Sequence, residues 1–165
     1  EAPNPLTIPW TGIVHTRPAM PYDAVRPGRF SYPLIRQSGE FVLNLTTQEL
    51  VPAADFCGVR SGREVDKFAA CGLTPQAASA VSAPLLAESP LSIECRVRQV
   101  LELGSHHMFL ADVVAVDVEE RLVDRQGKLH LERAGLAAYA HGAYFALGAP
   151  LGTFGFSVRK TPRRR

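Results

Sequence analysis

The stretch that decides the fold is "LGSHHMFLADVVAV" (residues 103–116), in which two adjacent histidines open a run that is otherwise almost entirely apolar. From Met108 onward, apolar residues occupy both faces of the expected strand for much of its length. A strand that is buried on both faces belongs to a closed sheet or to a sheet covered on both sides. Because successive side chains of a strand alternate, we expect His106 and His107 to face opposite ways.

The rest of the chain adds further strands and short helices. Strands are expected over 13–16, 22–25, 40–46 and 92–98, where apolar residues alternate with polar ones or β-branched residues are enriched. Helices are expected over 31–39, 46–58 and 63–72, each ending at a glycine, with Ser31 capping the first and Thr46 and Glu49 at capping-box spacing in the second. Residues 74–91 are expected to be loop, and 134–148 fit helix or strand equally well. This mixture favours a mainly β, antiparallel barrel with helical insertions over a doubly wound parallel sheet.

The length and the cysteine content limit the class of protein. The 165 residues fit one domain, residues 1–158, followed by a basic tail, residues 159–165. The three cysteines are odd in number and have no Cys-x-x-Cys spacing, which indicates a reducing compartment, so we expect a cytoplasmic protein. No apolar run reaches the roughly 18 residues of a membrane span, and the chain opens with no secretory leader, so we expect no membrane partner.

The formal net charge of +2 conceals an asymmetry. The tail "RKTPRRR" holds five of the 18 basic residues, so the remainder carries 13 basic and 16 acidic residues. Such a tail either contacts nucleic acid or is a solvated terminus, and the second interpretation is preferred, so no nucleic-acid partner is expected.

Motifs for common cofactors are mostly missing from the sequence. There is no P-loop and no GxGxxG after a strand, and the histidines and cysteines lack the spacing of metal ligands, so no metal site is expected. A phosphate can still be held at a helix start, where free N–H groups and the helix dipole favour an anion. Arg26 and Arg29 precede Ser31 at such a point, and they form either a phosphate site or a solvated turn.

Five segments, in this order and at these intervals, resemble the flavin reductase-like family of FMN-binding split-barrel proteins. They are "NPLTIPWTGIV" (4–14), "RPGRFSYPLI" (26–35), "GEFVLNLT" (39–46), "CGVRSGREVDKF" (57–68) and "LGSHHMFLADVVAV" (103–116). The resemblance runs from about Asn4 to Lys160. It implies a six-stranded Greek-key split β-barrel that forms a homodimer and binds FMN without a covalent bond. Relatives carry a further strand before Asn4, so we expect the first barrel strand to be missing from this chain or to lie upstream of Glu1.

The resemblance also implies the residues of the site. The flavin ring and its phosphate would be held by Trp10, Thr11, Arg26, Arg29, Ser31 and Tyr32. Asn44 would approach the flavin edge, and the loop that closes over the cofactor would contribute Ser61, Arg63, Lys67 and Phe68. His106 matches a histidine that lies near the nicotinamide site in relatives, so it would be the catalytic residue and face the cleft. Ser105 stands where many relatives have an aspartate, so His106 lacks that acidic partner.

The implied activity is that of an NAD(P)H-dependent reductase that passes electrons through FMN to free flavin, a ferric chelate or a partner protein. FMN performs hydride and single-electron transfer itself, which agrees with the lack of a catalytic dyad in the sequence. The alternative is a non-enzymatic FMN electron carrier. An oxidase of the pyridoxamine-phosphate type is disfavoured, because its binding motifs are not matched.

Overall fold

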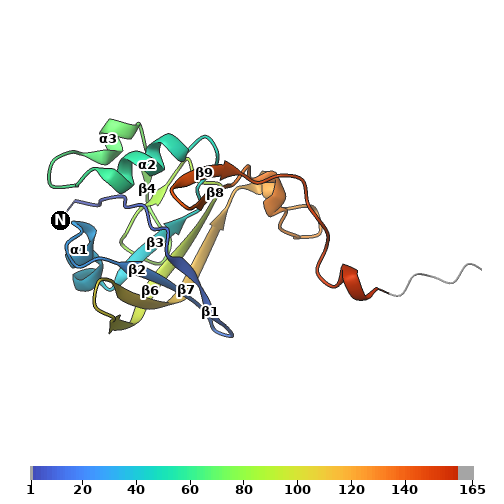
Figure 1. Cartoon of the computed structure of the whole chain (residues 1–165), viewed down its shortest axis with the longest axis horizontal. Coiled ribbons are helices and arrows are strands. Elements are labelled where there is room, and N and C mark those ends of the chain that lie inside the picture. Colours follow the sequence, from blue (N-terminus) through green and yellow to red (C-terminus); the bar gives the residue numbers. More distant parts are fainter. Residues whose placement is uncertain (1, 160–165) are drawn as a thin grey trace, which may run out of the picture.

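A five-stranded antiparallel sheet forms the body of the protein in the computed structural model, which describes residues 2–159 (Figure 1). The strand order is β1-β2-β7-β6-β3. The strands are β1 (Thr11–Thr16), β2 (Ala19–Val25), β3 (Glu40–Asn44), β6 (Leu91–Glu102) and β7 (His107–Val118). The mainly β architecture is confirmed. The main sheet has five strands in the described residues, so the six-stranded Greek-key detail stays a prediction.

The long β6–β7 hairpin is the centre of the sheet. It pairs from Leu91 opposite Val118 to Glu102 opposite His107, and its register shifts twice, which bends the two strands. The inward residues of β7, Phe109 and Ala111, are fully buried in the core. The expected burial of both faces is wrong for the second half of β7, where Val114, Val116 and Val118 are exposed.

Three helices occur at the expected segments; the first begins at the expected residue, and the other two begin later than expected. They are α1 (Ser31–Ser38), α2 (Val51–Val59) and α3 (Lys67–Cys71). The predicted glycine ends of α1 and α3 are confirmed, because Gly39 and Gly72 adopt left-handed backbone with φ of 68° and 63°. At α3 the cap is Asp66, whose carboxylate accepts a hydrogen bond from Ala69 N–H at 3.2 Å.

The predicted N-caps of α1 and α2 are wrong, because Ser31 and Thr46 form hydrogen bonds with other segments of the chain instead. Phe30 occupies the cap position of α1, and the Ser31 hydroxyl instead accepts a hydrogen bond from Asn4 Nδ2 at 2.7 Å. In α2 the helix begins only at Val51, and Thr46 accepts a backbone hydrogen bond from Ala137 N–H at 3.0 Å. Pairing with this distant segment holds Thr46 outside the helix. The predicted end at Gly58 is wrong by one residue, since α2 continues to Val59.

The segment predicted as loop, 74–91, holds one small pair of strands, β4 (Pro75–Gln76) and β5 (Leu85–Leu86). Between them, residues 79–82 point their backbone N–H groups at two glutamates. Ser79, Ala80 and Val81 donate to the Glu94 carboxylate at 2.6–3.0 Å. Ser82 donates to Glu40 Oε2 at 2.8 Å. This glutamate-held loop, residues 79–82, is therefore fixed to β6 and β3.

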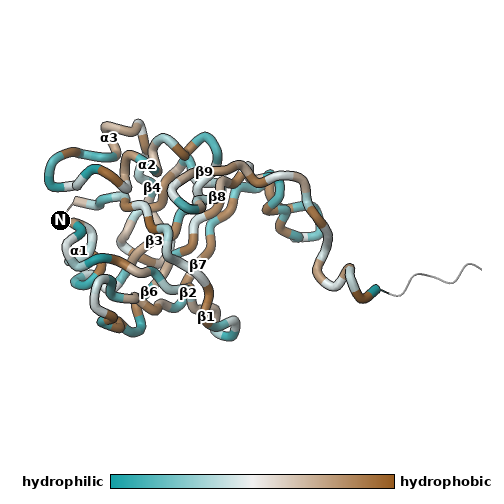
Figure 2. Tube along the Cα trace, in the orientation of Figure 1, coloured by the Kyte–Doolittle hydropathy of each residue, from teal (hydrophilic) through white to brown (hydrophobic). Residues whose placement is uncertain are grey.

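The ambiguous stretch 134–148 forms a β-hairpin rather than a helix. Its strands are β8 (Ala137–Ala140) and β9 (Ala143–Ala146), and short helical turns lie at Glu120–Leu122, Leu131–Arg133 and Phe156–Val158. Residues 147–159 then extend away from the body as an arm (Figure 1), and Figure 2 shows hydrophobic residues along it. Leu151 and Phe154 on this arm are fully exposed. Of the predicted basic tail, only Arg159 belongs to the described residues, and 160–165 lie outside them.

Within residues 2–159, none of the helices has the length and apolar character needed to cross a membrane.

His130 joins two carboxylates near the base of this arm. Its Nε2 lies 2.8 Å from Asp124 Oδ2, and its Nδ1 lies 2.8 Å from Glu132 Oε1. Both ring nitrogens can donate only in the imidazolium form. Accordingly, the hydrogen bonds to Asp124 and Glu132 raise the pKa of His130, and the bond to His130 lowers the pKa of Asp124 to about 2.

We therefore expect the stabilising effect of His130 to depend on pH. Because the pKa of His130 is raised in the folded state, its contribution to the free energy of unfolding is present below the ordinary pKa of 6.5. This contribution is lost as the pH rises through the folded-state pKa. The Asp124 contribution is present above its ordinary value of 3.8 and is lost as the pH falls toward about 2. Thermal unfolding of wild type and His130→Leu should differ more at about pH 5.5 than at about pH 9. An equal difference at both pH values would contradict this expectation.

Candidate functional site

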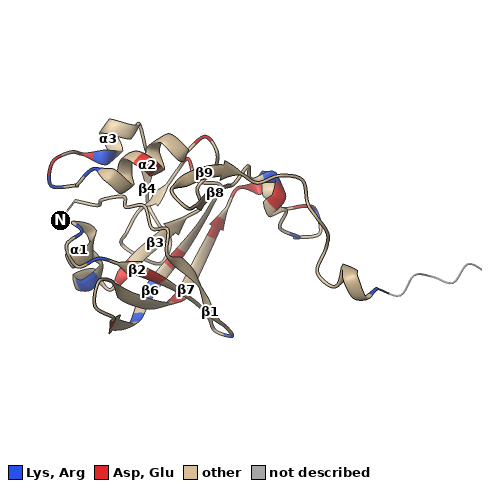
Figure 3. Cartoon of the chain, viewed as in Figure 1, with Lys and Arg blue, Asp and Glu red and all other residues tan. Residues whose placement is uncertain are grey.

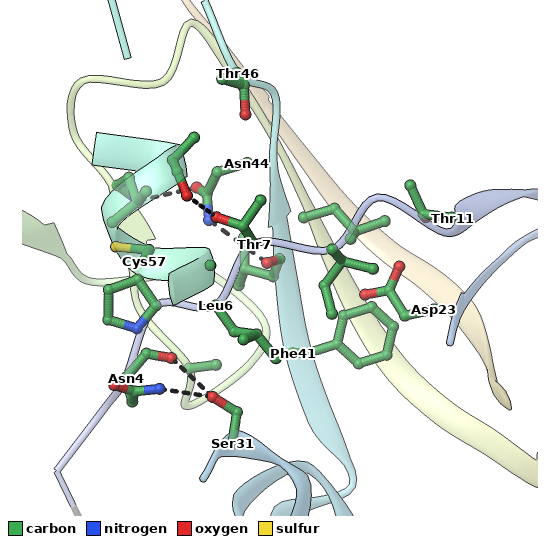
Figure 4. Close-up of a pocket in the computed structure, with 18 of the residues that line it drawn as sticks. Asn4, Leu6, Thr7, Thr11, Asp23, Ser31, Phe41, Asn44, Thr46 and Cys57 are labelled. Atoms are coloured by element: carbon green, nitrogen blue, oxygen red, sulfur yellow. Dashed lines mark hydrogen bonds between the residues drawn. The ribbon is translucent and has the colours of Figure 1, made fainter. Parts of the chain in front are cut away.

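A cleft of about 1200 Å³ is lined by the two edge strands of the sheet, β1 and β3, together with the N-terminal segment 2–9 and α2 (Figure 4). The segment 2–9 lies in extended backbone along this cleft because its three prolines, Pro3, Pro5 and Pro9, disfavour a helix. Most of the surface is apolar, with Leu6 and Phe41 among the lining residues.

A second, smaller cavity of about 260 Å³ adjoins the cleft. Its lining comes from the turn before α1, the loop before α3 and the N-terminal segment, and consists of Asn4, Leu6, Gly28, Arg29, Phe30, Ser31, Val59, Arg60, Ser61, Gly62, Arg63, Glu64 and Lys67. Four of these side chains are cationic and one is anionic, so we call this cavity the basic pocket. Figure 3 marks the positions of Lys and Arg in blue along the chain near α1 and α3. Asn4, Leu6, Arg29, Ser31 and Val59 line both cavities.

Backbone contacts fix the cationic residues around the basic pocket. Arg29 follows a turn in which its own N–H donates to the Arg26 carbonyl, and its guanidinium donates to the Gly58 carbonyl at 3.0 Å. In the loop before α3, the Ser61 hydroxyl accepts a hydrogen bond from Arg63 N–H at 3.2 Å. These bonds hold the turn and the loop at the two sides of one cavity.

Lys67 connects the basic pocket to the core. Its side chain is buried, and Nζ donates to the carbonyls of Pro5 at 3.0 Å and Cys57 at 2.8 Å. Burial lowers the pKa of this ammonium, and the neighbouring Cys57 opposes the shift. An ammonium has three donors, so Lys67 keeps one for a ligand while two tie the N-terminal segment to α2.

Asn44 presents one end of its amide to the cleft. Its Oδ1 accepts hydrogen bonds from Leu86 N–H at 2.9 Å and from the Ser92 hydroxyl at 2.7 Å. The Nδ2 group has only a long contact, 3.5 Å to the Val42 carbonyl. The amide is therefore locked in orientation by its oxygen, and its donor end is the one available to a ligand.

The structure brings most of the expected cofactor residues together. The residues that line the cleft or the basic pocket are Thr11, Arg29, Ser31, Asn44, Ser61, Arg63, Lys67 and Phe68. Trp10, Arg26 and Tyr32 line neither cavity. The Arg26 side chain is exposed, and the Tyr32 hydroxyl lies 2.7 Å from His107 Nδ1 beside the core residue Phe109.

The two histidines have different neighbours, but His106 lies in the turn before β7, so the expected strand alternation does not apply to it. His106 packs its ring against the exposed indole of Trp10 with 4.3 Å between centroids, and its Nδ1 lies 3.1 Å from the Ser105 hydroxyl. His107 contacts Tyr32. Neither histidine is among the residues that line the two cavities.

Sequence reasoning missed Asp23, a buried carboxyl group in the wall of the cleft. It is 3% exposed, and burial raises its pKa to about 6, although the nearby Thr11 hydroxyl opposes the shift. No local sequence signal marked this residue: Pro21, Asp23 and Val25 alternate along β2, but only the structure shows that all three side chains are buried. An acid in that row is unusual, since ionisable side chains are almost never fully buried without a partner.

The fold and the two adjoining cavities define a mainly β domain with an apolar cleft and a pocket lined by four cationic side chains. The family profile described as "Flavin reductase like domain" matches residues 1–148, and the chain belongs to this family. Its structural neighbours are flavoredoxins and split-barrel flavin reductases.

Solved structures agree with this assignment. The flavoredoxin of Desulfovibrio vulgaris (Miyazaki F) superimposes with a TM-score of 0.88 and 27% identity, covering 94% of this chain and 85% of that chain. The flavoredoxin from Methanosarcina acetivorans gives 0.85 and 25%, with the same coverage of 94% and 85%. An FMN-binding protein from Thermus thermophilus gives 0.72 and 26%, covering 89% and 82%.

Curated relatives match over a shorter stretch. An uncharacterised protein of Archaeoglobus fulgidus is 30% identical over 116 residues, which are 70% of this chain and 66% of the relative. One from Aeropyrum pernix is 37% identical over 94 residues, 56% of this chain and 36% of the relative. The matched stretch thus spans less than two thirds of the length of either relative.

Proposed function

We propose that this protein binds FMN, with the phosphate in the basic pocket and the ring system along the cleft. The observation that carries the proposal is that Arg29 and Ser31, from the turn that leads into α1, and Arg63 and Lys67, from the segment that leads into α3, line one cavity. Charged donors of this kind form the strongest hydrogen bonds to phosphate.

The shape of the two cavities also supports this ligand. They share a boundary at Asn4, Arg29 and Ser31, so one molecule can place an anionic end in the basic pocket and an extended apolar body in the cleft. FMN has one phosphate at the end of a chain that carries a flat ring system. The T. thermophilus structure, whose protein is named for FMN binding, is 26% identical to this chain.

The activity that we propose is an NAD(P)H-dependent reductase whose acceptor is free flavin, a ferric chelate or a partner protein. When bound, FMN supplies hydride and single-electron transfer. The residues of this chain then orient the ring, exclude water on the side of Phe41 and anchor the phosphate.

We also propose that the protein forms a homodimer, because Phe145, Leu151 and Phe154 expose large apolar side chains that a second copy would cover. We further propose a cytoplasmic location, because the cysteines are free thiols.

Two measurements test this function. The flavin released on denaturation, identified by mass spectrometry, should be FMN; FAD as the sole species would contradict the proposal. The FMN-loaded protein, mixed anaerobically with NADH or NADPH in a stopped-flow instrument, should bleach rapidly near about 450 nm.

A second candidate is an electron carrier without NAD(P)H activity, favoured by the 27% identity to a flavoredoxin over 94% of this chain. In that case the bound flavin should stay oxidised with both nicotinamides and be reduced by a protein donor. The stopped-flow trace separates the two functions.

His106 is the residue that we propose near the nicotinamide, because it packs against Trp10, whose neighbours in the chain, Pro9 and Thr11, line the cleft. We expect His106→Ala to slow flavin reduction by NAD(P)H while the protein remains yellow. His107→Ala is the comparison variant, because His107 contacts Tyr32 instead. Single-turnover rates of both variants equal to wild type would exclude a part for His106.

A further inference from the structure

Asp23 lies at the centre of β2 with its side chain turned toward the interior. On β7 its cross-strand partner is Phe109, and on β1 it is Thr11. Figure 4 shows the carboxyl group in the wall of the cleft, between the Phe41 ring and Thr11. The group therefore has the apolar core on one side and the open cleft on the other.

One oxygen of this carboxyl group, Oδ1, is buried and has no hydrogen-bond partner among the described residues. The Thr11 hydroxyl, the nearest polar group of β1, donates to the Tyr22 carbonyl at 2.8 Å. The Cys95 thiol on β6 interacts electrostatically with Asp23. Burial is the larger cause that raises the pKa of this thiol to about 12, and the negative charge of Asp23 is the smaller cause. The other titratable side chains that line the cleft are Arg29, Glu40, Asp55, Cys57, Tyr139 and Tyr144.

Folding alone does not account for an acid at this position. A buried polar group without a hydrogen bond opposes folding, and an ionised one does so strongly. Val25, two residues along the same face of β2, shows that an apolar side chain packs well there. The remaining source of a partner is the cleft, which is open to a ligand.

We propose that Asp23 is a ligand-recognition residue, whose carboxylate accepts a hydrogen bond from an N–H group on the heterocyclic ring of the molecule held in the cleft. This inference rests on the proposed function, in which the anionic end of that molecule occupies the basic pocket. Flavins carry a ring imide N–H of the required kind. A carboxylate acceptor makes such a hydrogen bond stronger than a neutral one.

A pH dependence of binding follows. A hydrogen bond to the ionised form lowers the pKa of Asp23 in the complex below its value of about 6 in the free protein. Affinity must then rise as the pH increases from about 5 to about 7, by roughly tenfold for each unit of that shift. The FMN phosphate also titrates near about pH 6, so riboflavin, which has no phosphate, is the probe for this measurement.

Three readouts on the full chain test the proposal. Riboflavin affinity of the wild type should increase with pH, and that of Asp23→Asn should not. Asp23→Leu should raise the unfolding temperature of the flavin-free protein yet reduce the further rise that FMN produces. The Asp23 carboxyl resonance, followed by carbon NMR, should titrate at about pH 6 in the free protein and at a lower pH when riboflavin is bound.

Asp112→Asn is the matched control. Asp112, on β7, also has a buried Oδ1 but pairs with Arg98 at 3.1 Å and does not line the cleft, so its replacement should leave flavin binding unchanged. If wild type binds flavin while Asp23→Asn shows the same affinity and pH profile, the inference about Asp23 is overturned and the proposed function stands. If the wild type binds neither FMN nor riboflavin, both are overturned. Should Asp23→Leu fail to fold, Asp23→Asn and the NMR titration still decide.

Discussion

Replacing Arg29 and Arg63 together by alanine is expected to weaken FMN binding by about a hundredfold or more. Hydrogen bonds between charged groups contribute roughly 1.5–3 kcal/mol each, and each tenfold change in affinity corresponds to about 1.4 kcal/mol. The two arginines flank the basic pocket from different segments, one before α1 and one before α3. Both side chains are exposed, so we expect the variant to fold.

Quenching of flavin fluorescence measures this affinity directly. Arg36→Ala is the control, because Arg36 lies in the last turn of α1 and pairs with Glu102 at 3.3 Å, away from both cavities. Wild-type binding should also weaken as salt is added, since screening acts on exposed charges. An unchanged dissociation constant in the double variant would show that the two arginines are only solvated. Arg26→Ala, measured in parallel, tests the third arginine expected from the sequence.

Replacing Glu94 by alanine is expected to cost about 3 kcal/mol or more of folding free energy, which is a large part of the roughly 5–15 kcal/mol of an ordinary domain. Glu94 is fully buried in β6 and accepts hydrogen bonds from three successive N–H groups of the glutamate-held loop and from the Ser79 hydroxyl at 2.7 Å. Alanine leaves these donors without an acceptor and a cavity in their midst. Urea unfolding of the variant measures the loss.

The pH dependence gives a second check on Glu94. Burial raises the pKa of this carboxyl group, but hydrogen bonds from Ser79 and Ala80 outweigh burial and bring it to about 2, below the ordinary 4.5. Its contribution is therefore present above about pH 4.5 and is lost as the pH falls toward 2. The difference between wild type and Glu94→Ala should shrink over that range. The control is Glu102→Gln, an exposed ion pair with Arg36, where we expect a change within about 0.5 kcal/mol.

The parts of the fold that were predictable from sequence are those whose signals are local. The β7 strand, the end of α1 at Gly39 and the end of α3 at Gly72 follow from apolar patterning and from backbone that favours glycine. The start of α2 was not predictable, because Thr46 pairs with Ala137, which is remote in the sequence. The hairpin over 134–148 was ambiguous because alanine-rich sequence has little preference that separates helix from strand.

The candidate site likewise contains residues that could be singled out from the sequence and one that could not. Arg29, Ser31, Arg63 and Lys67 belong to two short motifs, so they could be singled out before their spatial meeting was known. Asp23 could not, since its meaning depends on what surrounds it on β1, β6 and β7 rather than on its neighbours in the chain. Only the folded sheet shows that Oδ1 of this acid has no hydrogen-bond partner within residues 2–159.

Gly62 has no side chain, and this allows the segments around the basic pocket to pack closely together. A Cβ atom at Gly62 would stand 2.5 Å from Phe30 Cδ1 and closer still to Asn4 Oδ1. Glycine permits this close approach of backbone to side chains. The Asn4 amide has little room to retreat, because it donates to the Ser31 hydroxyl at 2.7 Å. Over evolutionary time, positions 4, 30 and 62 should therefore change together: a homologous chain with alanine at the third should carry a smaller residue at the first or second.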